Sequence, residues 1–122
     1  MTAKRVVVVD DDADMRLLVK LVVESDGDRR VVAEYDACPE RCETVPDVLV
    51  LDNQMRDTTG IECARRITAS FPTLPIILFS AYLDPTVEHQ AASVGIAACL
   101  PKDQYHQLPE LIDSLVAAAP FN

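Results

Sequence analysis

The stretch VVVVDDDADMR, residues 6–16, places four consecutive β-branched residues directly before a run of aspartates. A short run of this kind is typical of a strand buried on both faces of a parallel sheet. Three more apolar runs are each followed by one polar residue: Val48–Leu51 by Asp52, Ile76–Phe79 by Ser80, and Ala97–Leu100, after one proline, by Lys102. Because the carboxyl ends of parallel strands gather at one edge of a sheet, we expect an acidic cluster there, with one hydroxyl and one ammonium beside it.

Helical patterns separate these runs. Five helices are expected: one that begins at Asp12 or Asp14 and closes at Gly27, one over Cys38–Thr44, one from Gly60 to Phe71, one between Asp84 and Gly95, and one over 108–119. A further short strand begins at Val31. Strand and helix then alternate five times, with connections too long for hairpins. The sequence therefore predicts one α/β domain over residues 1–122, a flavodoxin-like doubly wound five-stranded parallel sheet in the order 2-1-3-4-5 with helices on both faces.

Charge and composition exclude several classes of function. The 122 residues carry a net charge of −9, and Lys102 is the only Lys or Arg after Arg66, so direct nucleic-acid binding by this chain is not expected. We find no secretion signal and no apolar stretch of membrane length, which predicts a cytoplasmic protein with no membrane partner. Four cysteines without a CxxC pair favour reduced thiols over a zinc site: Cys38, Cys42, Cys63 and Cys99.

The expected acidic cluster has a definite chemistry. Carboxylates that converge repel one another unless a cation neutralises them, and an all-oxygen site suits Mg²⁺. A carboxylate beside Mg²⁺ can act as a nucleophile toward phosphorus and become an aspartyl phosphate. Lys102 and Ser80 have the ammonium and the hydroxyl that would stabilise the oxygens of a phosphoryl group.

Four segments together resemble the receiver domain of two-component response regulators. They are VVVVDDDADMR at 6–16, PDVLVLDNQM at 46–55 with TTG at 58–60, PIILFSA at 75–81, and GIAACLPKD at 95–103. The resemblance implies a role for each matching position: Asp52 as the phosphoacceptor, Asp11 as a direct magnesium ligand, Asp10 as its partner through water, Gln54 as the donor of a backbone carbonyl to the metal, Ser80 as the switch hydroxyl, Lys102 as the phosphoryl-binding lysine, and Ala81 as the small residue that keeps the pocket open.

The sequence departs from the receiver pattern at three positions. Arg56 stands where a proline is usual, and Cys99 stands where a Tyr or Phe is usual. Lys102 is followed by Asp103 rather than by a proline in a cis peptide, so a trans bond is expected. The segment LPKD resembles receivers that precede helix-turn-helix output domains, which leaves open whether such a domain follows Asn122 in a longer protein.

The resemblance implies a signalling module rather than an enzyme with a product of its own. A histidine kinase or a histidine phosphotransfer protein would supply the phosphoryl group. Phosphorylation would then bias a two-state equilibrium that is read by a partner or a homodimer on the face of the fourth helix, fifth strand and fifth helix.

Two alternatives remain at this point. A haloacid-dehalogenase-like phosphohydrolase would use Asp10 and Asp12 as its DxD motif, but the chain lacks the Thr or Val that should follow and the cap of a longer protein. A receiver-like interaction domain that is never phosphorylated would not need the complete acid, hydroxyl and lysine set.

Overall fold

The computed structural model describes residues 3–41 and 45–119. Its elements in chain order are β1 (Lys4–Val9), α1 (Ala13–Val23), β2 (Arg29–Tyr35), β3 (Val48–Leu51), α2 (Gly60–Ser70), β4 (Ile76–Ser80), α3 (Pro85–Ser93), β5 (Ala98–Pro101), the 3₁₀ helix η1 (Lys102–Gln107) and α4 (Leu108–Ala118). No helix among the described residues is long and apolar enough to cross a membrane.

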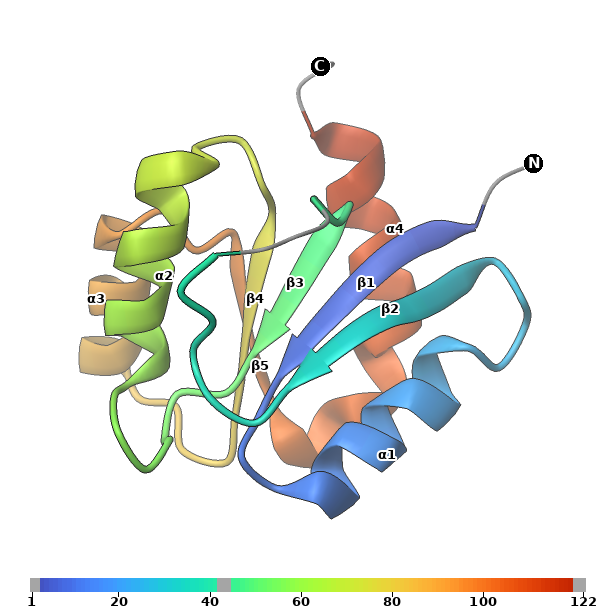
Figure 1. Ribbon diagram of the computed structural model, residues 1–122, viewed down its shortest axis with the longest axis horizontal. Coiled ribbons are helices and arrows are strands. Elements are labelled where there is room, and N and C mark those ends of the chain that lie inside the picture. Colours follow the sequence, from blue (N-terminus) through green and yellow to red (C-terminus); the bar gives the residue numbers. More distant parts are fainter. Residues whose placement is uncertain (1–2, 42–44, 120–122) are drawn as a thin grey trace.

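The five strands form one parallel sheet in the order β2-β1-β3-β4-β5, as predicted. Helices α1 and α4 cover one face, and α2 and α3 cover the other (Figure 1). Because all strands point the same way, the residues that follow β1, β3, β4 and β5 meet at one edge. The predicted fold class is therefore confirmed, and it places the candidate residues together.

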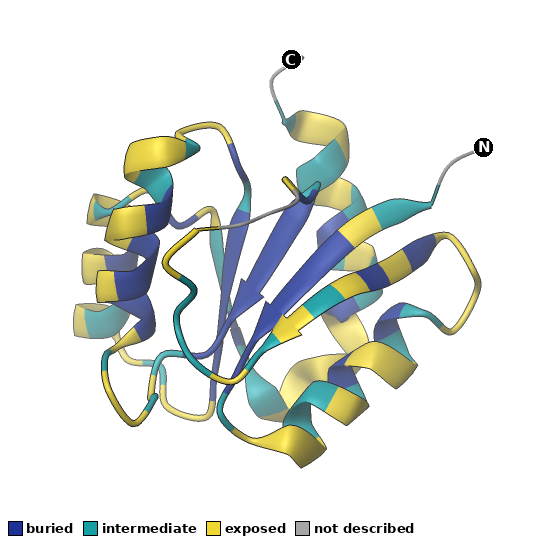
Figure 2. Ribbon diagram, viewed as in Figure 1, coloured by how far each residue is buried: buried dark blue, intermediate teal, exposed yellow. Residues whose placement is uncertain are grey.

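Alternation along β1 divides the core into two layers. Val6 and Val8 pack with the α1 and α4 side, whereas Val7 and Val9 pack with the α2 and α3 side. Strands β3 and β4 are buried along their whole length and β1 is buried from Val6 to Val9, whereas β2 at the edge alternates between buried and exposed residues (Figure 2). Burial of both faces explains why β1 and β3 are continuous apolar runs.

Capping residues set the helix boundaries as the sequence indicated. Asp12 is the N-cap of α1 and accepts hydrogen bonds from the amides of Asp14 and Met15. Asp84 caps α3 in the same way, with Pro85 at the first helical position. Gly95 follows α3 with φ +90°, a left-handed conformation that glycine adopts without strain.

The predicted helix over Cys38–Thr44 is wrong for the part that the structure describes. Residues 38–41 are irregular, and Cys42–Thr44 lie outside the described residues. Pro39 disfavours a helical conformation at the residue before it, so the chain does not turn into a helix after β2. The connection from β2 to β3 is instead tied to α2 by a disulfide.

The prediction of reduced thiols is also wrong at two positions. Cys38 and Cys63 form a disulfide, although 25 residues separate them in the sequence. Cys42 lies outside the described residues, and Cys99 is a free, half-buried thiol. The fold, not the local spacing, brings the two half-cystines together. The absence of a CxxC pair therefore does not exclude this disulfide.

Candidate functional site

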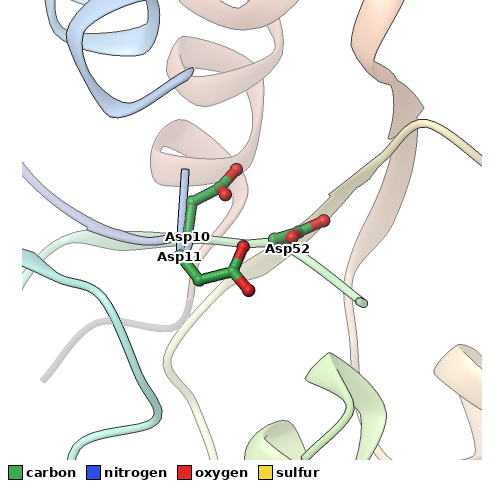
Figure 3. A group of neighbouring side chains, drawn as sticks. All are labelled: Asp10, Asp11 and Asp52. Carbon is green, nitrogen blue, oxygen red and sulfur yellow. The ribbon is translucent and has the colours of Figure 1, made fainter. Parts of the chain in front are cut away.

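Three carboxylates converge where β1 and β3 end side by side. Val9 is the register partner of Leu51, so Asp10 and Asp11 lie next to Asp52 (Figure 3). One carboxylate oxygen from each of the three lies within 4.8 Å of the others. Asp10 and Asp52 are only 2% and 5% exposed, while Asp11 is half-buried. The predicted acidic cluster is present, and its oxygen ligands suit a hard divalent cation.

Lys102 lies against two of these carboxylates. Its Nζ is 3.0 Å from Oδ2 of Asp10 and 3.2 Å from Oδ1 of Asp52. Burial lowers the pKa of Lys102, but the hydrogen bond to Asp10 and the charges of both carboxylates outweigh it, so the pKa is raised overall. The lysine therefore stays charged beside Asp52.

Asp52 itself is electrostatically strained. Burial raises the pKa of its carboxyl group, and the charge of Asp10 raises it further. Lys102 and the backbone at Gln54 oppose this shift without cancelling it. A carboxylate in this environment is stabilised by added positive charge, or by a reaction that removes the charge from its oxygens.

Hydrogen bonds fix the start of the acidic loop. The Asp12 amide donates to Oδ1 of Asp10 at 2.9 Å. Arg16, one turn into α1, donates from its guanidinium to the backbone carbonyl of Asp10 and pairs with Glu34 of β2 at 3.4 Å. Sequence reasoning missed this role of Arg16, because its spacing in α1 also fits an ordinary exposed helix face.

The loop after Asp52 is short and folded back on itself. Gln54 and Thr59 form an isolated antiparallel bridge, and the Gly60 amide donates to the carbonyl of Asn53 at 2.8 Å. The side chain of Asn53 accepts from the Ile61 amide, which binds the loop to the first turn of α2. Arg56 is exposed at the tip of this loop. Its position leaves Arg56 available to a docking partner.

Ser80 and Lys102 reach the same edge from the next two strands. Ser80 is the last residue of β4 and is paired with Pro101 of β5, one residue before Lys102. The Ser80 hydroxyl is buried and lies 3.3 Å from both the carbonyl oxygen and the amide nitrogen of Tyr82. It is therefore bonded to its own turn rather than to the acidic cluster. The Lys102–Asp103 peptide is trans, as expected.

Comparison with known proteins places this geometry in a family. The family model described as "Response regulator receiver domain" matches residues 6–115. The chain belongs to this family. The receiver assignment covers β1 through most of α4 and includes every candidate site residue.

Curated relatives carry the receiver as one part of a longer protein. A protein-glutamate methylesterase/protein-glutamine glutaminase of Rhizobium johnstonii is 35% identical over 98 residues, which is 77% of this chain and 26% of that protein. The Pyrococcus abyssi protein of the same name is 33% identical over 93% of this chain and 33% of its own length. This chain thus spans about a quarter to a third of the methylesterases that it matches.

Solved receivers have the same fold. The response regulator domain of Thermotoga maritima CheB aligns with a TM-score of 0.85 and 25% identity, covering 98% of this chain and all of that one. The signal receiver domain of the putative response regulator NarL from Mycobacterium tuberculosis aligns with a TM-score of 0.87 and 27% identity, covering 97% and 99%.

These matches do not favour a haloacid-dehalogenase-like phosphohydrolase. That function needs Asp12 as the second acid of the DxD motif. In the structure the Asp12 carboxylate is exposed and caps α1, where it accepts two backbone amides. The Asp12 carboxylate thus serves as the helix N-cap, and it is not one of the three clustered carboxylates.

Proposed function

We propose that this receiver accepts one phosphoryl group on Asp52 in a Mg²⁺-dependent reaction. The donor would be the phosphohistidine of a histidine kinase or of a histidine phosphotransfer protein. The observation that carries the proposal is the position of Asp52, a buried carboxylate beside Asp10, Asp11 and the ammonium of Lys102.

Asp52 is suited to be the nucleophile. One of its carboxylate oxygens would form the new bond to phosphorus while the bond from phosphorus to the donor imidazole breaks, and the electron pair stays on the imidazole nitrogen. Burial and Asp10 already disfavour the free carboxylate, as the raised pKa of Asp52 indicates. Converting it to an acyl phosphate would remove the carboxylate charge and place negative charge on the phosphoryl oxygens, where Lys102 and the metal would offset it.

Lys102 and Ser80 would bind the transferred group. Lys102 is charged and in contact with Asp52, so a small movement would bring its ammonium to a phosphoryl oxygen. Ser80 would have to exchange its hydrogen bonds to Tyr82 for one to the phosphoryl group. This exchange would link occupancy of the site to the backbone of the loop before α3.

The acidic cluster would hold the metal. We assign Asp11 and Asp52 as carboxylate ligands, Asp10 as their partner through water, and the backbone carbonyl of Gln54 as a further oxygen ligand. When bound, Mg²⁺ supplies positive charge that offsets the repulsion of these carboxylates and of the phosphoryl oxygens. The all-oxygen donor set and the burial of two of its members support this assignment.

The proposed output is a change on the face formed by α3, β5 and α4, read by a partner or by a second copy of the chain. The domain would act in the cytoplasm, as one receiver over residues 1–122, without a catalytic product and without binding nucleic acid itself. Transcription regulation is one context that fits this output, and the relatives leave open which output domain the receiver serves. A Bacillus subtilis "uncharacterized transcriptional regulatory protein" is 29% identical over 94% of this chain, and the match covers 54% of that protein.

The test is intact mass measurement after incubation with acetyl phosphate and Mg²⁺. We expect one added phosphoryl group on the wild type and none on Asp52→Asn. Asp57→Asn, an exposed aspartate of the same loop, is the matched control and should label like the wild type. Undiminished labelling of Asp52→Asn would overturn the assignment, and no labelling of the wild type would favour an unphosphorylated interaction domain.

A further inference from the structure

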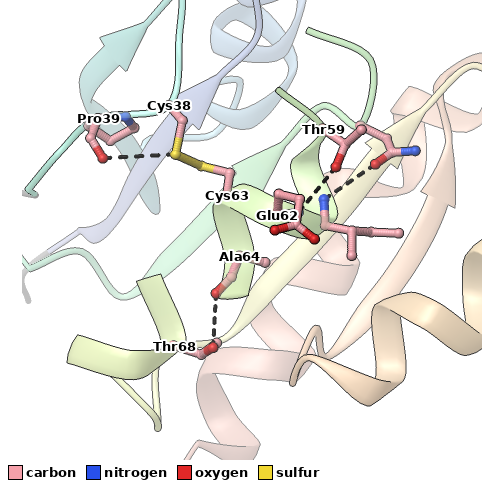
Figure 4. Close-up of a disulfide and its surroundings, with 9 residues drawn as sticks. Cys38, Pro39, Thr59, Glu62, Cys63, Ala64 and Thr68 are labelled. Carbon is pink, nitrogen blue, oxygen red and sulfur yellow. Dashed lines mark hydrogen bonds between the residues drawn. A yellow bond between two sulfur atoms is a disulfide. The ribbon is translucent and has the colours of Figure 1, made fainter. Parts of the chain in front are cut away.

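The disulfide between Cys38 and Cys63 joins two segments that the backbone fold leaves separate. Cys38 lies in the irregular connection after β2, and Cys63 lies in the first turns of α2 (Figure 4). Their α-carbons are 5.8 Å apart, a distance that a disulfide spans without movement of the backbone. Cys63 is completely buried in the core, whereas Cys38 is half-buried.

Little else holds this connection to the domain. Among the described residues, no backbone hydrogen bond links residues 36–41 to the sheet or to α2. A cavity of about 120 Å³ is lined by Pro39–Arg41 on one side and by the last turns of α2 with its C-cap on the other, at Arg66, Ile67, Ser70 and Phe71. In the part of the chain that the structure describes, the disulfide is therefore the one bonded link between 36–41 and α2, beside the apolar contact of Cys38 with the core.

The disulfide also closes a covalent ring of the chain that includes Asp52. The ring runs from Cys38 through β3, Asp52 and the following loop to Cys63. The Cys63 amide donates to the carbonyl of Thr59 at 3.0 Å, and Thr59 pairs with Gln54. One helical turn thus separates the disulfide from the loop that follows Asp52.

We infer that Cys38–Cys63 is a reversible redox site that controls the mobility of the loop after Asp52. A dithiol reductant would attack the half-buried sulfur of Cys38, and the Cys63 sulfur would leave as a thiolate and take up a proton. The second thiol of the reductant would then release Cys38 as a thiol. Two electrons and two protons pass to the protein, and the reductant leaves as a disulfide. Oxidation by a low-molecular-weight disulfide reverses the step.

The oxidised form holds the connection and α2 together, and the reduced form releases them. Disulfides in reducing compartments are mostly transient or redox-sensing, so reversibility is the expected behaviour at the proposed cytoplasmic location. The effect on phosphorylation rests on the proposed function. Reduction should slow the labelling of Asp52 several-fold, because a mobile loop positions the backbone of Gln54 and the carboxylate of Asp52 less well.

The test compares the native protein in oxidised and reduced dithiothreitol. Peptide mapping should find Cys38 linked to Cys63 in the oxidised sample. Reduction should leave the far-ultraviolet circular dichroism unchanged, and after the reduced sample is then denatured both cysteines should be alkylated by iodoacetamide. Amide exchange followed by mass spectrometry should be faster in peptides covering 36–41 and 53–63 after reduction, and glutathione disulfide should restore the slower rate.

Variants separate the redox effect from general destabilisation. Cys38→Ser and Cys38→Ala, in an irregular segment, should exchange like the reduced wild type in both buffers. Cys99→Ser should keep the redox response, because Cys99 is outside the disulfide. A disulfide that involves another cysteine, or equal exchange at 53–63 in both states, would overturn the inference.

Acetyl phosphate labelling of the two redox states tests the link to the site. Equal labelling rates in both states would overturn that link. A wild type that labels in neither state would instead refute the proposed function, while the exchange data would still decide the redox inference.

Discussion

A β-carbon on Gly60 would lie 2.3 Å from the backbone carbonyl oxygen of Asp52. It would also lie 2.9 Å from the α-carbon of Asn53. Both obstacles are backbone atoms, which cannot rotate away as a side chain can. Glycine is required here by the close approach of α2 to the candidate phosphoacceptor, and this contact positions the loop between them.

Gly60→Ala should therefore disturb both stability and the site. We expect the free energy of unfolding to fall by about 1–3 kcal/mol, the usual cost of forcing extra volume into a packed region. Mg²⁺ affinity should fall as well, since the backbone of Asp52 must shift. Urea unfolding and calorimetric titration with Mg²⁺ measure the two effects.

Gly27→Ala is the matched control for that substitution. Gly27 has φ +81°, and a β-carbon added there would meet no atom within 4 Å, so alanine should cost about 1–2 kcal/mol through backbone strain alone. Its Mg²⁺ affinity should equal that of the wild type. If Gly60→Ala also binds Mg²⁺ with unchanged affinity, the contact with Asp52 does not position the site.

Magnesium should stabilise the folded protein through the acidic cluster. At ten times the Kd, binding adds about 1.4 kcal/mol, which raises the Tm by roughly 3–6 °C for a chain of this size. Asp11→Ala should lose most of this shift, while Asp14→Asn, an exposed residue of the first turn of α1, should keep it. A full Mg²⁺ shift in Asp11→Ala would mean that the metal binds elsewhere.

The ion pair between Arg29 and Asp113 should make the stability of the fold depend on pH. Arg29 is 3% exposed and donates to both carboxylate oxygens of Asp113 at 2.8 and 2.7 Å. Although burial raises the pKa of Asp113, the hydrogen bonds from Arg29 and Lys4 outweigh it and lower the pKa overall. A carboxyl group with a lowered pKa stabilises the fold above its unfolded pKa, near 4, and this contribution is lost as the pH falls through the folded value.

Asp113→Asn should destabilise the protein at neutral pH. We expect a loss of about 1–2 kcal/mol, less than for a fully buried pair, because the Asp113 side chain is 41% exposed. The difference from the wild type should shrink below about pH 4, where Asp113 itself becomes protonated. Urea unfolding at pH 7 and pH 3, with Asp57→Asn as a neutral control, measures it. A difference that does not change with pH would refute the role of this charge.

The fourth prediction concerns the route from Asp52 to the output face. Cys99 stands where receivers usually have an aromatic switch residue, and a thiol moves too little apolar area to act in that way. The Ser80 hydroxyl is bonded to the backbone of Tyr82, whose side chain is 74% exposed. Movement of Ser80 toward a phosphoryl group should therefore act through the segment at Tyr82.

Amide exchange of the α3 and β5 peptides, with and without acetyl phosphate, tests this route. Tyr82→Ala should weaken the phosphorylation-dependent change, and Cys99→Ala should leave it intact. The opposite result, a response lost in Cys99→Ala and kept in Tyr82→Ala, would show that the small side chain is the switch.

The sheet and most of the site could be predicted because each strand carries its own signal. An apolar run followed by a polar residue predicts that the run is a buried strand and that the polar residue lies at the carboxyl edge of the sheet, as for Val6–Val9 with Asp10. The start of α3 could also be predicted from local sequence, since an aspartate followed by a proline favours a helix start whatever the rest of the fold.

Long-range features left no comparable trace in the sequence. Arg29 and Asp113 are 84 residues apart, and only the tertiary fold, in which α1 packs against both β2 and α4, brings them together. The disulfide between Cys38 and Cys63 depends in the same way on the path of an irregular connection. The weak apolar pattern over 38–44 suggested a helix, but Pro39 and the attachment to α2 favour another conformation in the part of that segment that is described.

Every strand runs toward the acidic edge, so β1 begins and α4 ends at the opposite edge of the sheet (Figure 1). A fluorophore, an affinity handle or a surface linker attached beyond either of these elements would stand a whole strand length away from Asp52. Such an immobilised receiver would turn its acidic edge toward the solution, so donor encounters and metal exchange could be recorded directly without obstruction of the site.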